Sequence, residues 1–302
     1  MILRTLASSS SGNCVLVQSG GTSVLLDAGI SCRKITQRLR ECGLTPGDLS
    51  GILVTHEHTD HVAGLSVLLK RRHIPVYASE GTCNALAFRQ PEAAGHLMVA
   101  PAGSYFQLGS LTVTSFPTSH DAAQSVGYTV SDGTHTAALV TDLGVVTDYV
   151  DQVVTGAELV LLEANHDVGM VRNGPYPRRL QERILGQQGH LCNEAAAEFA
   201  VSLAKRGTSR FVLSHLSRDN NRPELAHAAV EGALEREGLK AQVCLAPRDA
   251  LAPRDAPDGQ KPKPPWKLLN GQSVSMVVLF MRQQLPRWNP IYCMRHFVPS
   301  AP

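Results

Sequence analysis

The apolar positions of the first half of the chain fall in short runs that are separated by glycine- and serine-rich turns. Runs of four to eight residues that are rich in Val, Ile and Leu predict β-strands. The predicted strands are 1–6, 14–18, 22–26, 51–55 and 75–79, and two hairpins follow around Gly109-Ser110 and Asp132-Gly133. The N-terminal half is therefore expected to be rich in β-structure.

The second half alternates between segments with helical spacing of apolar residues and short apolar runs. The predicted helices are 33–42 and 62–70 in the first part of the chain, and 145–154, 193–205 and 223–237 in the second. The predicted strands of the second part are 158–163, 210–214 and 242–245. Alternating helices and strands favour sheets that are covered by helices. The pattern predicts an α/β fold with one core that extends to about residue 247.

A change in composition follows. The tandem sequence LAPRDALAPRDA leads into a proline-rich stretch, which lacks enough apolar surface to offset the entropy of ordering it. We therefore expect a catalytic domain over residues 1–247 and a tail over residues 248–302 that is mostly disordered.

Composition excludes some classes of protein. The net charge is +2, so any contact with nucleic acid requires a local basic groove. No apolar stretch reaches the ~20 residues of a membrane span, and the N-terminus lacks the pattern of a secretory signal. The seven cysteines are scattered and form no C-x-x-C pair, which favours a reducing, cytoplasmic setting.

The segment HEHTDH, residues 56–61, directly follows an apolar run. Residues two apart on an extended chain point the same way, so His56 and His58 are able to face one ion. Asp60 and His61 follow in the turn, where they suit a second ion. Imidazole and carboxylate groups are natural ligands of zinc, manganese and ferrous iron. Glu57 is expected to point away from the histidines and to have a structural role.

Other polar residues also end apolar runs. They are Asp27 in LLDAG, His120 in FPTSHD, Asp142 in ALVTDLG and His215 in FVLSHLS. Several predicted strands are thus followed directly by a potential metal ligand. This repeated pattern predicts one site at the edge of a sheet.

These positions match, in order, the motifs of the metallo-β-lactamase-fold hydrolases, which the chain resembles over about residues 1–247. The resemblance implies an αββα sandwich, in which two mixed β-sheets are flanked by helices. It also implies two divalent metal ions, Zn²⁺ or Mn²⁺. One ion would be held by His56, His58 and His120, and the other by Asp60, His61 and His215. Asp142 would bridge the ions, and Asp27 would orient a ligand histidine.

Further segments resemble the YycJ/WalJ-type branch of this family, among them SSSSGNC, EANHD and LSHLSRDNNRPELA. Members of that branch are regarded as cytoplasmic, metal-dependent 5′-to-3′ DNA exonucleases. The resemblance implies a phosphodiesterase in which a hydroxide bridging the two ions attacks phosphorus, with Asp60 in the catalytic centre.

Several roles remain open from the residues alone. His166 and His190 are candidates for protonating the leaving sugar oxygen, although either is also compatible with a structural position. Ser11 and Asn13 belong to a loop, residues 9–13, that is either a flexible turn or a phosphate site built from backbone N–H groups and hydroxyls. Arg218 and Arg222 are candidates for contacts with the DNA backbone.

The same ligands also suit other substrates. A hydrolase of a small thioester or lactone and an RNA-processing nuclease remain alternatives, with RNA as a possible substrate beside DNA. A non-catalytic metal protein is disfavoured, because a structural site is usually closed and does not need seven ligands around two ions.

Overall fold

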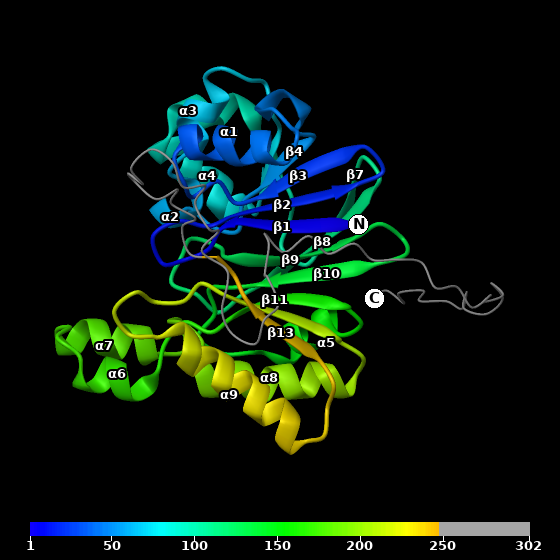
Figure 1. The fold of residues 1–302 in the computed structure, drawn as a ribbon. Helices are drawn as coiled ribbons and strands as arrows, with labels where there is room; N and C mark the ends of the chain where they lie inside the picture. Colours follow the sequence, from blue (N-terminus) through cyan, green and yellow to red (C-terminus); the bar gives the residue numbers. More distant parts are fainter. Residues whose placement is uncertain (248–302) are drawn as a thin grey trace, which may run out of the picture.

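Two β-sheets lie face to face at the centre of the structure, a computed structural model that describes residues 1–247 (Figure 1). The first sheet has six strands in the order β1-β2-β3-β4-β5-β6. Their bounds are β1 Ile2–Ala7, β2 Cys14–Ser19, β3 Thr22–Leu26, β4 Gly51–Leu53, β5 Val76–Ala78 and β6 Leu97–Val99. The sheet is mixed, because β1 to β3 pair antiparallel and β3 to β6 pair parallel.

The second sheet has seven strands in the order β13-β12-β11-β10-β9-β8-β7. Their bounds are β7 Tyr105–Leu108, β8 Leu111–Pro117, β9 Val126–Ser131, β10 Thr136–Val140, β11 Leu159–Glu163, β12 Arg210–Ser214 and β13 Gln242–Leu245. This sheet is also mixed: β7 to β10 pair antiparallel, whereas β10 to β13 pair parallel.

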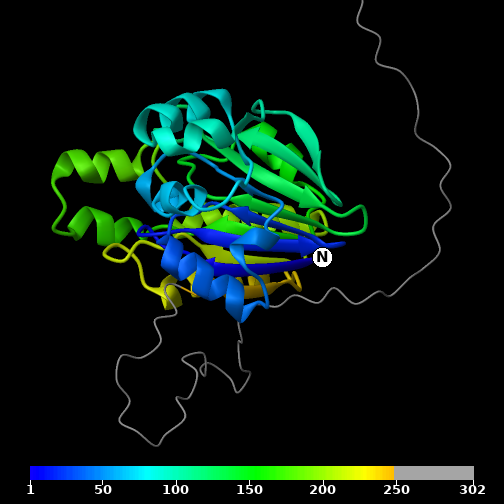
Figure 2. The ribbon, with the colours of Figure 1, turned by 90° about the horizontal axis from the view of Figure 1, so that it is seen from above.

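Helices cover the outer face of each sheet (Figure 1). The first sheet is covered by α1 Cys32–Glu41, α3 Leu65–Leu69 and α4 Glu80–Arg89, with the short α2 Thr59–Val62 at one end. The second is covered by α5 Asp148–Val154, α8 Asn193–Lys205 and α9 Pro223–Arg236. The helices α6 Val168–Asn173 and α7 Arg178–Leu185 project from one end of the sandwich (Figure 2). The expected αββα sandwich is confirmed.

Strand β11 shows how the sequence builds these layers. All five of its residues are buried, and alternate side chains of a strand face opposite sides of the sheet. Leu159 and Leu161 belong to the core between the two sheets, whereas Val160 and Leu162 belong to the core beneath the helices. A strand that is buried on both faces requires a continuous apolar run, and the sequence LVLLE supplies it.

One predicted helix was wrong. The segment 62–70 is not continuous, because α2 ends at Val62 and α3 begins at Leu65. Between them, the amide of Gly64 donates to the carbonyl of Ala28 at 2.8 Å. A Cβ atom at Gly64 would lie 2.2 Å from the carbonyl oxygen of Ile30. The chain therefore breaks where its backbone packs directly against the segment that follows β3.

The sequence patterns also missed the helices α4, α6 and α7 and the short strand β6. The predicted tail, residues 248–302, lies outside the described residues, so the division of the chain at residue 247 stays a prediction. Within residues 1–247, no helix combines the length and the apolar character that crossing a membrane requires.

Candidate metal centre

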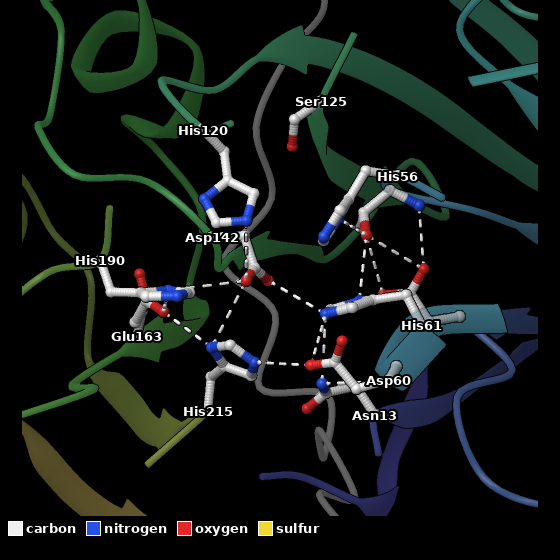
Figure 3. Close-up of polar contacts among 12 residues, drawn as sticks. Asn13, His56, Asp60, His61, His120, Ser125, Asp142, Glu163, His190 and His215 are labelled. Carbon is white, nitrogen blue, oxygen red and sulfur yellow. Dashed lines mark hydrogen bonds and ion pairs between the residues drawn. The ribbon is translucent and has the colours of Figure 1, made fainter. Parts of the chain in front are cut away.

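Several of the predicted metal ligands, together with the residue expected to orient one of them, follow the carboxyl ends of strands. Asp27 follows β3, His56 lies shortly after β4, Asp142 follows β10 and His215 follows β12. His120 lies three residues beyond the end of β8. Because the carboxyl ends of parallel strands meet at one edge of a sheet, these side chains come together. Figure 3 shows His56, His120, Asp142 and His215 around one site.

The backbone is strained at three of these positions. Asp27, Asp142 and His215 have positive φ values of 61°, 60° and 56°, and they are the only non-glycine residues of the described chain that do. Left-handed backbone is uncommon for residues with a side chain, and such strain gathers at functional sites. Here each positive φ turns the chain sharply as it leaves a strand.

The first predicted triad is formed. Ligand atoms of His56, His58 and His120 lie within 4.8 Å of one another. Nδ1 of His56 lies 3.0 Å from the hydroxyl oxygen of Thr55, and Nδ1 of His120 lies 3.0 Å from the carbonyl oxygen of Gly189. These contacts leave Nε2 of both rings to face the site.

The second predicted triad is also formed. Ligand atoms of Asp60, His61 and His215 lie within 4.8 Å of one another. Oδ2 of Asp60 lies 3.4 Å from Nε2 of His61 and 3.4 Å from Nε2 of His215. Burial alone would raise the pKa of Asp60, but hydrogen bonds with the two histidines hold it below its usual range. Asp60 is therefore a carboxylate at neutral pH.

Asp142 lies between the two triads (Figure 3). Its Oδ2 is 3.4 Å from Nε2 of His61, and its Oδ1 is 3.8 Å from Nε2 of His120. Asp142 therefore reaches one histidine of each triad, and its role as a bridging ligand stays a prediction.

Two buried carboxylates contact Nδ1 of predicted ligand histidines, on the side of each ring that faces away from the site. Oδ2 of Asp27 lies 2.8 Å from Nδ1 of His61, and the orienting role of Asp27 stays a prediction. Oε1 of Glu163 lies 2.7 Å from Nδ1 of His215. Burial opposes a charge on His215, but Asp142, Asp60 and Glu163 outweigh it and raise the pKa of His215 to about 10.

The residues fit metal ions. Nε2 of His56 is buried and has no hydrogen-bond partner in residues 1–247. Such buried polar atoms are costly unless something binds them. Burial, together with the neighbouring His61, His120 and His58, also holds the pKa of His56 well below its ordinary value. A neutral imidazole with an unused nitrogen is a metal ligand, and the mixed imidazole and carboxylate set suits Zn²⁺ or Mn²⁺.

Glu163 was missed by the sequence analysis, although the signal was present. It ends the apolar run of β11 at the same sheet edge as the other ligands. Its Oε1 also lies 2.9 Å from Nδ1 of His190, and its Oε2 accepts hydrogen bonds from the amides of Leu143 and Leu191. Burial would raise the pKa of Glu163, but His190 and His215 lower it below its usual range.

The two histidines without an assigned ligand role differ in position. The ring of His190 lies 5.0 Å from that of His120 and 5.3 Å from that of His215, so His190 belongs to the site. His166 is buried, and its Nδ1 has no hydrogen-bond partner in the described chain. Burial lowers the pKa of His166 to about 4, so it is neutral at pH 7.

Four backbone amides of the serine-rich loop, residues 9–13, donate hydrogen bonds to partners within the chain. The amide of Ser9 donates to Oδ1 of Asn13, and the amide of Ser11 donates to Oγ of Ser9. The amide of Gly12 donates to the carbonyl of Ser9, and the amide of Asn13 donates to the carbonyl of Asp60. Ser11 itself is exposed, whereas the side chain of Asn13 reaches His61. Contacts of these two side chains with substrate stay a prediction.

The remaining candidates lie close to the site in sequence. Arg218 and Arg222 are exposed on the segment between β12 and α9, which begins with His215. Glu57 is buried, and its Oε1 accepts a hydrogen bond from the amide of Ala123 at 2.9 Å. Glu57 thus holds the loop that follows His120, in agreement with the structural role expected for it.

Fold and site together define a class of protein. A family model described as "Beta-lactamase superfamily domain" matches residues 22–216, and the chain belongs to this superfamily, with the metallo-β-lactamase fold. The chain is 40% identical over 239 residues to "Exodeoxyribonuclease YycJ" of Bacillus anthracis, which covers 78% of this chain and 89% of that protein.

Two further comparisons agree. "Exodeoxyribonuclease WalJ" of Streptococcus pneumoniae serotype 2 (strain D39 / NCTC 7466) is 37% identical over 237 residues, which cover 78% of this chain and 88% of that protein. The crystal structure of the metallo-beta-lactamase fold protein YhfI from Bacillus subtilis matches with a TM-score of 0.63 at 17% identity, over 82% of this chain and 96% of that chain. The structural match supports the fold alone.

Proposed function

We propose that this protein is a metal-dependent exodeoxyribonuclease that degrades DNA from the 5′ end. The observation that carries the proposal is the arrangement of two ligand triads around Asp142, in a chain that is 37–40% identical to two exodeoxyribonucleases over most of their length. That similarity favours DNA over RNA and over a thioester or lactone.

The described residues suit two divalent ions, and we propose Zn²⁺ or Mn²⁺. When bound, two such ions supply an activated water and neutralise charge that develops on a phosphoryl group. His56, His58 and His120 would hold one ion and Asp60, His61 and His215 the other, with Asp142 between them. Asp27 and Glu163 keep the rings of His61 and His215 turned toward the site.

The leaving sugar oxygen requires a proton, and His190 is the better placed of the two candidate histidines. Its Nδ1 is held by the buried carboxylate of Glu163 at 2.9 Å, which leaves Nε2 as the donor. Within residues 1–247, Nδ1 of His166 has no hydrogen-bond partner, and at pH 7 its ring is in the neutral form, which is a poor acid. We assign the general acid to His190.

We place contacts with the DNA backbone at Arg218 and Arg222, and further contacts with the substrate at Ser11 and Asn13. The proposed compartment is the cytoplasm. It is supported by the six cysteines of the described region, which are all free thiols.

The test is a substrate panel with metal-loaded protein. A 5′-labelled DNA should be degraded to mononucleotides, and RNA, a chromogenic thioester and nitrocefin should be poorer substrates. Asp60→Asn and His61→Ala should abolish DNA cleavage without unfolding the protein, because each removes a ligand of the second triad. Asp48→Asn, at an exposed carboxylate that binds the amide of Thr45, is the matched control. Unchanged cleavage by Asp60→Asn would exclude the second triad from the reaction.

A further inference from the structure

Asn13 is fixed against the second triad by its own backbone. It lies in the loop between β1 and β2, and its amide donates to the carbonyl of Asp60 at 2.8 Å. Its carbonyl accepts from the amide of Gly29, also at 2.8 Å. The residue is 8% exposed. Asn13 therefore has one position relative to the Asp60 ligand, although it comes from a distant part of the chain.

The orientation of its side chain is equally defined. Oδ1 of Asn13 accepts a hydrogen bond from the amide of Ser9 at 3.1 Å, which identifies the other amide atom as the nitrogen. That nitrogen, Nδ2, lies 3.2 Å from Nε2 of His61 and 3.4 Å from the carbonyl oxygen of Asp60 (Figure 3). The side chain thus aims its two N–H groups at the second triad.

The nitrogen that Asn13 faces is the one His61 offers to the site, because Nδ1 of His61 is turned to Asp27 at 2.8 Å. Once the lone pair of Nε2 is used in coordination, it no longer accepts a hydrogen bond. Within residues 1–247, the remaining acceptor for Nδ2 is the carbonyl of Asp60, at a distance near the upper limit of a hydrogen bond. One N–H group is then left free beside the triad.

We propose that Asn13 is a further catalytic residue, whose side-chain amide donates a hydrogen bond to a non-bridging phosphoryl oxygen of the DNA beside Asp60, His61 and His215. The assignment rests on the proposed nuclease function. A fixed donor gains strength as negative charge grows on that oxygen, and it needs no reorganisation during the reaction. An amide also suits the position because, unlike Lys or Arg, it adds no positive charge beside the metal ligands.

Two variants separate donation from structural support. Asn13→Ala removes the whole amide, whereas Asn13→Asp keeps an acceptor for the amide of Ser9, removes the donor and adds a negative charge beside the triad. Loss of one such donor costs about 10²–10³-fold in kcat in comparable sites. We expect a loss of this order in both variants with a much smaller change in KM. Asn173→Asp, at an exposed amide on α6, is the control for replacing an amide by a carboxylate.

A stereospecific sulfur substitution identifies the atom that Asn13 contacts. The natural protein should cleave DNA more slowly when the scissile phosphate carries an Rp or an Sp phosphorothioate. If Asn13 donates to one of the two oxygens, Asn13→Ala should reduce the sulfur effect for that isomer and leave the other unchanged. Equal sulfur effects in both proteins for both isomers would overturn the assignment.

Two readouts do not depend on cleavage. Metal content and chelator competition should be unchanged in Asn13→Ala, and loss of metal would show that Asn13 only supports the ligands. Inorganic phosphate, titrated calorimetrically into the metal-loaded protein, should bind about tenfold more weakly to Asn13→Ala. If the natural protein cuts no DNA, the nuclease proposal fails while the phosphate titration still tests Asn13. If it cuts DNA and Asn13→Ala cuts equally fast, only the Asn13 assignment fails.

Discussion

Oδ2 of Asp27 lies 2.8 Å from Nδ1 of His61, and both side chains are almost completely buried. Oδ1 of Asp27 also accepts a hydrogen bond from the amide of Thr55 at 2.9 Å. The carboxylate therefore ties the end of β3 to the segment that carries HEHTDH, and it fixes which nitrogen of His61 faces the site.

The first prediction concerns this contact. Asp27→Ala should lower the affinity for the second metal equivalent by about 10- to 100-fold, because the ring of His61 loses the partner that orients it. Chelator competition that resolves the two equivalents would measure the change. Asp48→Asn, at an exposed carboxylate that binds Thr45, serves as the control. The prediction would be contradicted if Asp27→Ala bound each of the two metal equivalents with the same affinity as the natural protein does.

The second prediction concerns pH. The pKa of His215 is about 10, above its ordinary value, so the metal-free ring is protonated at neutral pH. Its charge stabilises the metal-free fold below the ordinary pKa of histidine, and this contribution is lost as pH rises through about 10. A metal ion that binds His215 must displace this proton from the ring. The apparent metal affinity should therefore increase about tenfold for each unit by which the pH rises, for each proton displaced.

Competition titrations between about pH 6 and pH 9 would measure this slope. Glu163→Gln removes one of the carboxylates that raise the pKa of His215, so the slope should become shallower at the upper end of the range. An affinity that does not change with pH would show that His215 is already neutral in the metal-free protein.

The third prediction concerns the proton donor. His190→Ala should slow DNA cleavage by about 10²-fold, the usual contribution of a general acid. A thymidine 5′-p-nitrophenyl phosphodiester should be cleaved at a nearly normal rate, because its leaving group needs no proton. His166→Ala should show no such dependence on the leaving group. An equal loss on both substrates in His190→Ala would assign His190 to support of the ligands instead.

The same network gives a matched variant. Glu163→Gln keeps the size of the side chain but weakens its hold on His190 and His215. It should reproduce part of the leaving-group dependence of His190→Ala and, in addition, lower metal affinity. The two effects separate the contact with His190 from the contact with His215.

The fourth prediction concerns DNA binding. Arg218→Ala and Arg222→Ala should each raise KM and reduce the salt dependence of binding by about one unit of log–log slope, if each side chain contacts one phosphate. Arg89→Ala, at the end of α4, is the comparison. Salt slopes identical to that of the natural protein would place both arginines outside the path of the DNA.

The sequence by itself determined the helices and strands with clear periodicity. The predicted helix 193–205 and the strands 210–214 and 242–245 match α8, β12 and β13 residue for residue. It also indicated the ligand candidates, because each either ends an apolar run or lies in HEHTDH directly after one. The structure brings the members of each triad together. These features are local, so each of them can be predicted from a single short stretch of the sequence.

Only the tertiary structure decided the features that depend on contacts between distant segments. The break at Gly64 follows from backbone packing against Ala28 and Ile30. Glu163 matters because β11 lies beside β10 and β12 in the sheet, which places its carboxylate between His190 and His215. Asn13 faces His61 across 48 positions of sequence. The local periodicity of the sequence does not predict these contacts, because the packing of distant elements against one another determines which side chains meet.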